Sequence, residues 1–189
     1  MVAEIAATLA FSAIQNNDKI GVIFFSDRIE KFIPPKKGRK HILYIIRELL
    51  DFKPESTRTN IQCAIEYLTN VLKKRCTAFM LSDFIDERDF QNALTIANRK
   101  HDVVALQVYD RRLEELPDVG LMKVRDAETG HEQWIDTSSK SLRKTHHEWW
   151  KSRQQKLHEI FTHSNVDAVS VRTDQDYVKA LLNLFAKRN

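Results

Sequence analysis

The amino-acid sequence predicts an α/β fold of doubly wound character, in which helices cover both faces of a mostly parallel sheet. Two observations carry this prediction. Continuous apolar runs of strand length, typical of strands buried on both faces, recur along the chain. Between them lie longer segments with helical apolar spacing, and strands that alternate with helices form parallel sheets. No internal repeat, low-complexity tract or linker interrupts the sequence, so we expect a single domain over residues 1–189.

The first elements are expected to be a buried helix and a β-hairpin. Residues 2–15 are apolar on nearly every side, which is typical of a fully buried helix. Residues 20–25 form a continuous apolar run. Residues 29–33 alternate apolar and polar side chains before Pro34 and Pro35, which we expect to end the strand and to place it at a sheet edge.

The middle of the chain alternates helices and strands. One-sided apolar stripes predict helices at 39–51 and 60–74, and a further helix is expected at 87–100. The apolar runs at 76–83 and 101–110 predict two buried strands.

The last third of the chain begins with a different pattern. Residues 119–137 predict a short hairpin, with its turn at residues 128–130. Ser138 and Ser139 precede a long helical segment that runs to about residue 163, and they predict its cap. A strand at 166–171 and a closing helix at 177–187 follow. The closing helix is expected to face inward with Val178, Leu181, Leu182 and Phe185.

The composition is that of a soluble globular protein, with 42% hydrophobic and 30% charged residues and a net charge of +4. No apolar run approaches the ~20 residues that span a bilayer, and no secretory leader is visible. Cys63 and Cys76 make no disulfide framework, so we expect two reduced thiols in a cytoplasmic protein. A single disulfide between them is the less favoured alternative.

Acidic residues follow four of the predicted strands. They lie at Ser26-Asp27, Ser82-Asp83, Tyr109-Asp110 and Thr173-Asp174. Ligand groups gather at the carboxyl ends of strands in open α/β sheets, and the loop at 55–59 would reach the same edge. Oxygen ligands of this kind suit a hard cation such as Mg²⁺.

Four stretches carry a family resemblance across roughly three-quarters of the chain. They are residues 9–50, TRTNIQCAIEYL at 57–68, FMLSDF at 79–84 and residues 101–130. This arrangement resembles a von Willebrand factor A-type domain. It is most similar to the bacterial, uncharacterised family encoded beside MoxR-type AAA+ ATPases.

The resemblance implies a metal-ion-dependent adhesion site built from three segments. Thr59 matches the second segment and Asp83 the third, and Asp27 is a further candidate rim residue. The first segment, D-x-S-x-S on the central strand, would come before the helix at 2–15, where only Met1 stands. We therefore expect an N-terminally truncated domain without its first central strand. Mg²⁺ or another divalent cation would bind the full-length parent, and we expect none in this chain.

Both ligand candidates also have an ordinary structural interpretation. Thr59 and Gln62 fit a capping box, in which the threonine side chain accepts from the backbone N–H of Gln62. Asp83 would also favour the positive N-terminal end of the helix that follows it. These alternatives stay open at the level of sequence.

Three other patterns point to weaker candidates. The basic run from Lys36 to Lys40 would touch phosphates, although a solvated loop is its ordinary interpretation. His158 and His163 resemble a zinc-hydrolase motif, but they are five residues apart and do not share a helical face. The Trp149-Trp150 pair is expected to serve core or interface packing.

We expect a non-enzymatic protein-interaction or adaptor module whose partner, implied by the resemblance, is a MoxR-type AAA+ ATPase. The alternatives are a Mg²⁺-dependent phosphoester hydrolase and a weak nucleic-acid binder through Lys36–Lys40. No specific nucleic acid and no membrane contact are expected for this segment. Loss of a central strand would leave open edges at 20–26 and 77–82. Those strands are expected to pair directly with each other or to close the gap in a homo-oligomer.

Overall fold

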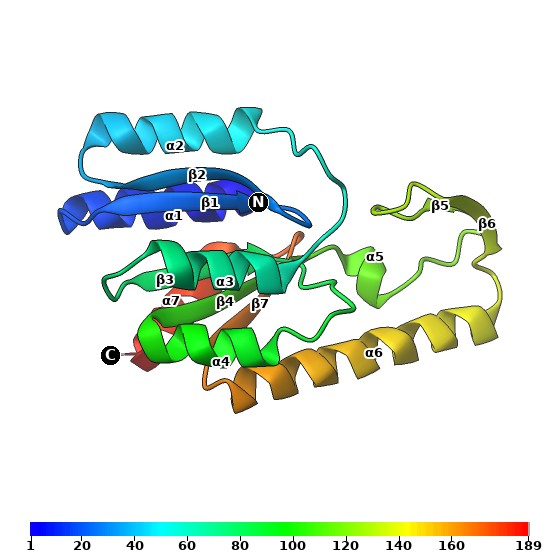
Figure 1. Cartoon of the computed structure of the whole chain (residues 1–189). Helices are drawn as coiled ribbons and strands as arrows, with labels where there is room; N and C mark the ends of the chain where they lie inside the picture. The colour runs from blue at the N-terminus through cyan, green and yellow to red at the C-terminus, as the bar shows by residue number, and fades with distance from the viewer. Residues whose placement is uncertain (189) are drawn as a thin grey trace.

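The computed structural model describes residues 1–188, which form seven helices and seven strands (Figure 1). The elements are α1 (Val2–Gln15), β1 (Ile20–Phe25), β2 (Ile29–Lys36), α2 (Arg39–Asp51), α3 (Ile61–Val71), β3 (Thr77–Ser82), α4 (Gln91–Lys100), β4 (Asp102–Tyr109), α5 (Arg111–Glu114), β5 (Leu121–Arg125), β6 (Glu132–Asp136), α6 (Lys140–His163), β7 (Asp167–Arg172) and α7 (Tyr177–Arg188).

A three-stranded parallel sheet in the order β3-β4-β7 forms the centre of the fold. Its register runs from Thr77 opposite Asp102 to Ser82 opposite Gln107, and β7 continues in parallel on the other side of β4. The apolar run of β4 is fully buried, as its sequence predicts, because strands and helices surround it on all sides. The expected α/β class is confirmed.

Helices cover both faces of this sheet (Figure 1). On one face, side chains from α3, α4 and α6 pack around Val103 and Ala105 of β4. On the other face, α1 and α7 pack against Val104, Leu106 and Val108. Alternate side chains of β4 therefore pack into two separate hydrophobic cores, one on each face of the sheet.

The strands β1 and β2 form their own antiparallel hairpin, which is not hydrogen-bonded to β3 within the described residues. Direct pairing of the strands at 20–26 and 77–82 was an expectation of the sequence, and it is wrong. The two sheets are joined through side chains instead. Phe25 of β1 and Met80 of β3 both pack on the cluster that Ile61 and Ile65 of α3 complete.

The prolines of β2 do not end the strand, which runs on to Lys36. They lie in a bulge, because Ile33 is opposite Val22 and Lys36 is opposite Ile20. Gly21 faces this bulge so closely that an added Cβ would lie 2.6 Å from the carbonyl oxygen of Ile33. An edge strand tolerates proline in a bulge because no ladder hydrogen bond is lost there.

Two helices are buried differently from expectation, since α1 was expected to be buried on all sides and α7 to turn other side chains inward. In α1, Ile5 and Ala10 are buried, whereas Phe11 is 45% exposed, so the helix is covered on one side only. In α7 the inward residues are Leu181 and Leu184. Val178, Leu182 and Phe185 are exposed, contrary to expectation for the closing helix. The apolar pattern of α7 contains two overlapping stripes, and its sequence alone does not say which one faces the sheet.

The hairpin at 119–137 is confirmed as β5 and β6. Its turn is closed by Asp126, whose carboxylate accepts from the backbone N–H groups of Glu128 and Thr129. The hairpin lies away from the central sheet, on the side toward which the N-terminal half of α6 extends (Figure 1). As predicted, α6 is capped by Ser139.

The structure also tests the expectations for the two cysteines and for membrane-spanning helices. Cys63 and Cys76 are both free thiols, so the less favoured disulfide does not form. Among the described residues, no helix combines the length and hydropathy that crossing a bilayer requires.

Candidate functional site

The carboxyl ends of β3, β4 and β7 meet at one edge of the sheet, hereafter the rim. The segment that joins α2 to α3 runs beside this rim (Figure 1). It is tied to the end of β1, since the backbone N–H of Asn60 donates to the carbonyl oxygen of Ser26 at 2.8 Å. The loop at 55–59 therefore reaches the edge where the sequence placed it.

Asp83 begins a tightly held turn directly after β3. Its carboxylate accepts from the backbone N–H of Ile85 at 3.0 Å, and the hydroxyl of Ser82 accepts from the N–H of Phe84 at the same distance. Phe84 has a φ of 57°, a left-handed conformation that is rare for a bulky residue. Strained backbone of this kind concentrates at binding and catalytic sites.

Asp83 does not cap the next helix, so that structural interpretation is wrong. The helix expected from residue 87 begins at Gln91, eight residues after Asp83. Asp89 serves its first turn instead, because its carboxylate accepts from the backbone N–H of Gln91 at 2.9 Å.

Thr59 is not the cap of α3, and the expected capping box with Gln62 is also wrong. The N-cap is Asn60, whose side chain accepts from the backbone N–H of Cys63 at 3.0 Å. The helix thus begins one residue later than the capping box requires. Within the described residues the half-buried Thr59 has no hydrogen bond at its hydroxyl, which leaves that oxygen free for a ligand.

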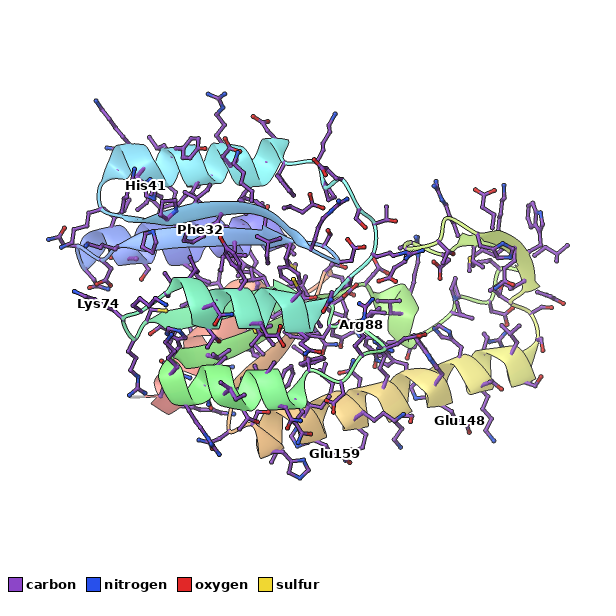
Figure 2. The ribbon with its side chains drawn as sticks, viewed as in Figure 1. Phe32, His41, Lys74, Arg88, Glu148 and Glu159 are labelled. Atoms are coloured by element: carbon purple, nitrogen blue, oxygen red, sulfur yellow. The ribbon has the colours of Figure 1, made fainter. Side chains whose placement is uncertain are left out.

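Asp86 and Arg88 fasten the loop after Asp83 to the loop that carries Thr59. The carboxylate of Asp86 accepts from the backbone N–H of Ile61 at 2.9 Å, and the guanidinium of Arg88 donates to the carbonyl oxygen of Thr59 at 2.7 Å. Arg88 lies beside the start of α3 (Figure 2). The structure thereby brings the two matched segments into contact. The sequence did not single out Asp86, because its partner is 25 residues away.

Asp27 belongs to a second cluster at the end of β1. The buried hydroxyl of Ser26 donates to Glu30 at 2.6 Å and approaches Asp27 at 3.3 Å. Glu30 also accepts from the backbone N–H groups of Glu55 and Ser56, both at 3.2 Å. Glu30 is therefore the residue that holds the 55–59 loop. Its place in an ordinary alternating strand gave no signal of this role.

Hydrogen bonding favours the ionised form of both carboxylates in this cluster. The hydroxyl of Ser56 is the main cause that lowers the pKa of Asp27 below its ordinary value. The hydroxyl of Ser26 does the same for the pKa of Glu30, helped by the two backbone N–H groups. Asp27 and Glu30 are thus ionised at neutral pH, with the guanidinium of Arg28 close to Asp27.

The other two strand ends are occupied by internal contacts. Asp110 accepts from the backbone N–H of Arg112 at 2.8 Å and caps α5. Asp174 forms an ion pair with Arg172 at 2.8 Å. Asp83 makes the same kind of contact as Asp110, with the backbone N–H two residues on, so this hydrogen bond does not distinguish the two carboxylates.

The two matched residues at the rim are of types that a hard cation accepts, although the charged group in contact with Thr59 is the guanidinium of Arg88. Thr59 and Asp83 supply one hydroxyl and one carboxylate, which are ligands that Mg²⁺ accepts while it keeps several waters. Among residues 1–188, no three His, Cys, Asp or Glu side chains gather in a way that would hold a metal ion. A tightly held cation would need further oxygen ligands.

Comparison with proteins of known sequence finds uncharacterised mycobacterial relatives. Protein Rv1480 of Mycobacterium tuberculosis strain H37Rv is 26% identical over 187 residues, which cover 97% of this chain and 58% of the relative. Protein MAV169 of Mycobacterium avium is 26% identical over 160 residues, which cover 82% of this chain and 93% of the relative. This chain thus spans about 58% of the length of Rv1480.

Comparison with solved structures supports the fold. A conserved hypothetical protein, BatB from Bacteroides thetaiotaomicron, superposes with a TM-score of 0.60 at 18% identity, over 98% of this chain and 87% of the other. An aerotolerance-related membrane protein from Bacteroides fragilis gives a TM-score of 0.59 at 17% identity, over 98% and 88% of the two chains. At these identities the likeness concerns the fold alone. The family described as protein of unknown function DUF58 matches residues 1–156, and the chain belongs to that family.

Proposed function

We propose that this chain is a non-enzymatic protein-interaction module of the von Willebrand factor A type, which works with a MoxR-type AAA+ ATPase. The observation that carries the proposal is the contact between the two matched loops, made by Asp86 with the backbone of Ile61 and by Arg88 with the carbonyl oxygen of Thr59. Asp83 stands before a left-handed Phe84, and the neighbouring loop offers the Thr59 hydroxyl without an internal partner. The family resemblance of the sequence supports the choice of partner.

In this mechanism the loops at the rim form a binding site for an acidic side chain of the partner. Thr59 and Asp83 would hold a divalent cation directly or through water. When bound, such a cation would supply a positive centre for a carboxylate of the partner. Asp86 and Arg88 keep the two loops together, and Glu30 fixes the loop that carries Thr59.

The test is a binding titration between the protein and a MoxR-type ATPase from the same organism. We expect binding in Mg²⁺ that weakens at least about tenfold in EDTA, because linked ligands stabilise each other's binding by 1–3 kcal/mol. Asp83→Asn and Thr59→Ala should abolish the Mg²⁺ dependence. Asp110→Asn is the matched control, since that carboxylate follows the next strand and makes the same backbone contact as Asp83 but lies outside the two segments that the resemblance matches. Equal binding with and without Mg²⁺ would contradict the proposal.

Enzymatic activity at the rim would contradict this proposal. The same preparations should show no turnover of phosphoester substrates in Mg²⁺. A specific hydrolysis rate that disappears in Asp83→Asn would assign the rim to a Mg²⁺-dependent hydrolase instead. We also propose a cytoplasmic location for this segment, which its two free thiols support.

A further inference from the structure

The helix α2 turns a mixed basic and apolar side toward solvent. Its inner side is buried through Ile42 and Ile45, and it packs on the β1–β2 hairpin. The helix lies at the outside of the molecule, at the top of Figure 1. Its exposed side, hereafter the outer face of α2, consists of Arg39, Lys40, Leu43, Tyr44, Arg47 and Leu50. Positions three, four and seven residues apart lie on one face of a helix, so these side chains share one surface.

The apolar members of the outer face are large and well exposed. Leu43 is 49% exposed, Tyr44 is 43% exposed and Leu50 is 70% exposed. Single exposed apolar residues are ordinary on protein surfaces. Three of them on one face of a single helix form a patch of the kind that marks a contact surface.

Basic side chains surround this patch, and no acid of the helix offsets them. The exposed cations that lead from β2 into the helix are Lys36, Lys37, Arg39 and Lys40. Glu48 is engaged by Lys31 at 2.5 Å, and Asp51 is engaged by Arg47 at 3.7 Å. Within residues 1–188 none of the four cations pairs with a carboxylate, so the start of α2 carries uncompensated positive charge.

This basic end lies opposite the rim. The strand β1 ends beside the rim, where Ser26 accepts from the backbone N–H of Asn60. The ring of His41 contacts the carbonyl oxygen of Ile20 at 2.9 Å, which holds the start of α2 against the start of β1. Figure 2 shows His41 at the far end of the molecule from Arg88. A partner bound at the start of α2 therefore leaves the rim accessible.

The leucines select the class of partner. Basic side chains alone suit any polyanion, and nucleic-acid surfaces are contacted by cations and stacked aromatic rings. An interfacial helix adds aliphatic side chains, which enter the boundary between lipid headgroups and acyl chains. Tyrosine is also enriched at that depth of the bilayer. Two exposed leucines among cations thus match an anionic lipid surface.

We propose that the outer face of α2, with Lys36 and Lys37, docks on an anionic phospholipid membrane. Leu43 and Leu50 enter the headgroup region, and the cations lie against the lipid phosphates. The sequence led us to expect no membrane contact, because no apolar run is long enough to span a bilayer. A helix that lies on the surface needs no such run. This contact requires neither the rim cation nor the ATPase.

The experiment is co-flotation of the protein in EDTA with vesicles of phosphatidylcholine that contain about one-quarter phosphatidylglycerol. We expect the protein to float with these vesicles and to stay behind with pure phosphatidylcholine. Lys37→Glu combined with Lys40→Glu should weaken binding at least about tenfold, because the attraction to anionic lipid is lost. Leu50→Ser should weaken it about threefold or more, because an inserted apolar side chain is lost.

Matched variants on other helices are the controls. Lys144→Glu combined with Lys151→Glu makes the same change in net charge at exposed positions of α6, and it should alter binding by less than about twofold. Leu182→Ser removes a leucine of α7 that is 65% exposed and should leave binding unchanged. All these substitutions are at exposed positions, so the melting temperature should stay close to that of wild type.

Three outcomes would overturn the proposal. The first is failure to float with the anionic vesicles. The second is an equal loss of binding in the α6 control, which would show attraction by net charge alone. The third is full binding by Leu50→Ser, which would reduce the outer face of α2 to a general contact for polyanions such as nucleic acid.

Discussion

At the scale of single residues, the turn at 82–86 is held in place by contacts from several directions. A left-handed conformation for a bulky residue costs on the order of 1–3 kcal/mol, so the surroundings of Phe84 must impose it. The ring of Phe84 is buried against Phe161, and Arg153 donates to the carbonyl oxygens of Phe84 and Asp86. These contacts hold the turn in its strained conformation and thereby fix the carboxylate of Asp83 at the rim.

Asp86 should be the acid of this turn on which stability depends most. Its side chain is 2% exposed and accepts from the backbone N–H of Ile61. Asp86→Ala should lower the free energy of unfolding by about 1–3 kcal/mol, because a buried donor loses its partner. Urea denaturation measures the change. Glu87→Ala, an exposed neighbour, is the control and should change stability by less than about 0.5 kcal/mol. Equal effects of the two substitutions would contradict this assignment.

Glu30 should make the stability of the chain sensitive to acid. Its pKa is lowered in the folded state, chiefly by the hydroxyl of Ser26, so its ionised form stabilises folding above the ordinary glutamate pKa of 4.5. This contribution is lost as the pH falls through the lowered pKa. We therefore expect wild type to be more stable than Glu30→Gln at pH 7, with the difference shrinking below pH 4.5. Denaturation curves from pH 3 to 8 test this, and a constant difference would refute it.

At the scale of elements, the start of α3 separates the roles of two adjacent residues. Asn60 caps the helix, whereas the hydroxyl of Thr59 has no internal partner in the described structure. Asn60→Ala should therefore cost about 1 kcal/mol of stability. Thr59→Ala should cost less than about 0.5 kcal/mol while removing a rim oxygen. Thermal or urea unfolding of the two variants decides between them, and the reverse order would restore the capping box.

Elements held by local contacts could be predicted from the sequence, whereas residues whose partners are distant in sequence could not. The helix at 39–51 is found as predicted, because the side chains that bury it, Ile42 and Ile45, belong to one local stripe. The helix expected from residue 87 starts four residues later, at Gln91. The acidic side chains before it accept hydrogen bonds from turn backbone and, for Asp86, from the backbone N–H of Ile61 at the start of α3. Thr59, before a helix, and Asp83, after a strand, were singled out by the family resemblance, and their role as ligands stays a prediction. Glu30 and Asp86 were not singled out, since their partners are distant in sequence.

At the scale of the whole molecule, the unpaired strand edges of the described structure include one edge of β1 and one edge of β3, the strands expected to flank the missing strand. Within the described residues β1 pairs only with β2, and β3 pairs only with β4. The apolar runs of both strands predict full burial, yet most of their residues are only half-buried. The helix α3 bridges the two sheets through side chains and leaves the backbone groups of the facing edges without strand partners. Exposed edges of this kind pair readily with other chains.

We therefore expect the 22.1 kDa chain to self-associate, with a mass by light scattering that rises with protein concentration. The competing cause would be the exposed apolar surface of the β5–β6 hairpin, where Trp134 is 65% exposed. Trp134→Ser removes that surface and leaves the strand edges intact, so it should not reduce association. Thr77→Lys places a charge at the exposed start of β3 and should reduce it, because lysine at an edge opposes strand pairing. A monodisperse monomer at all concentrations would show that the open edges do not recruit a second copy.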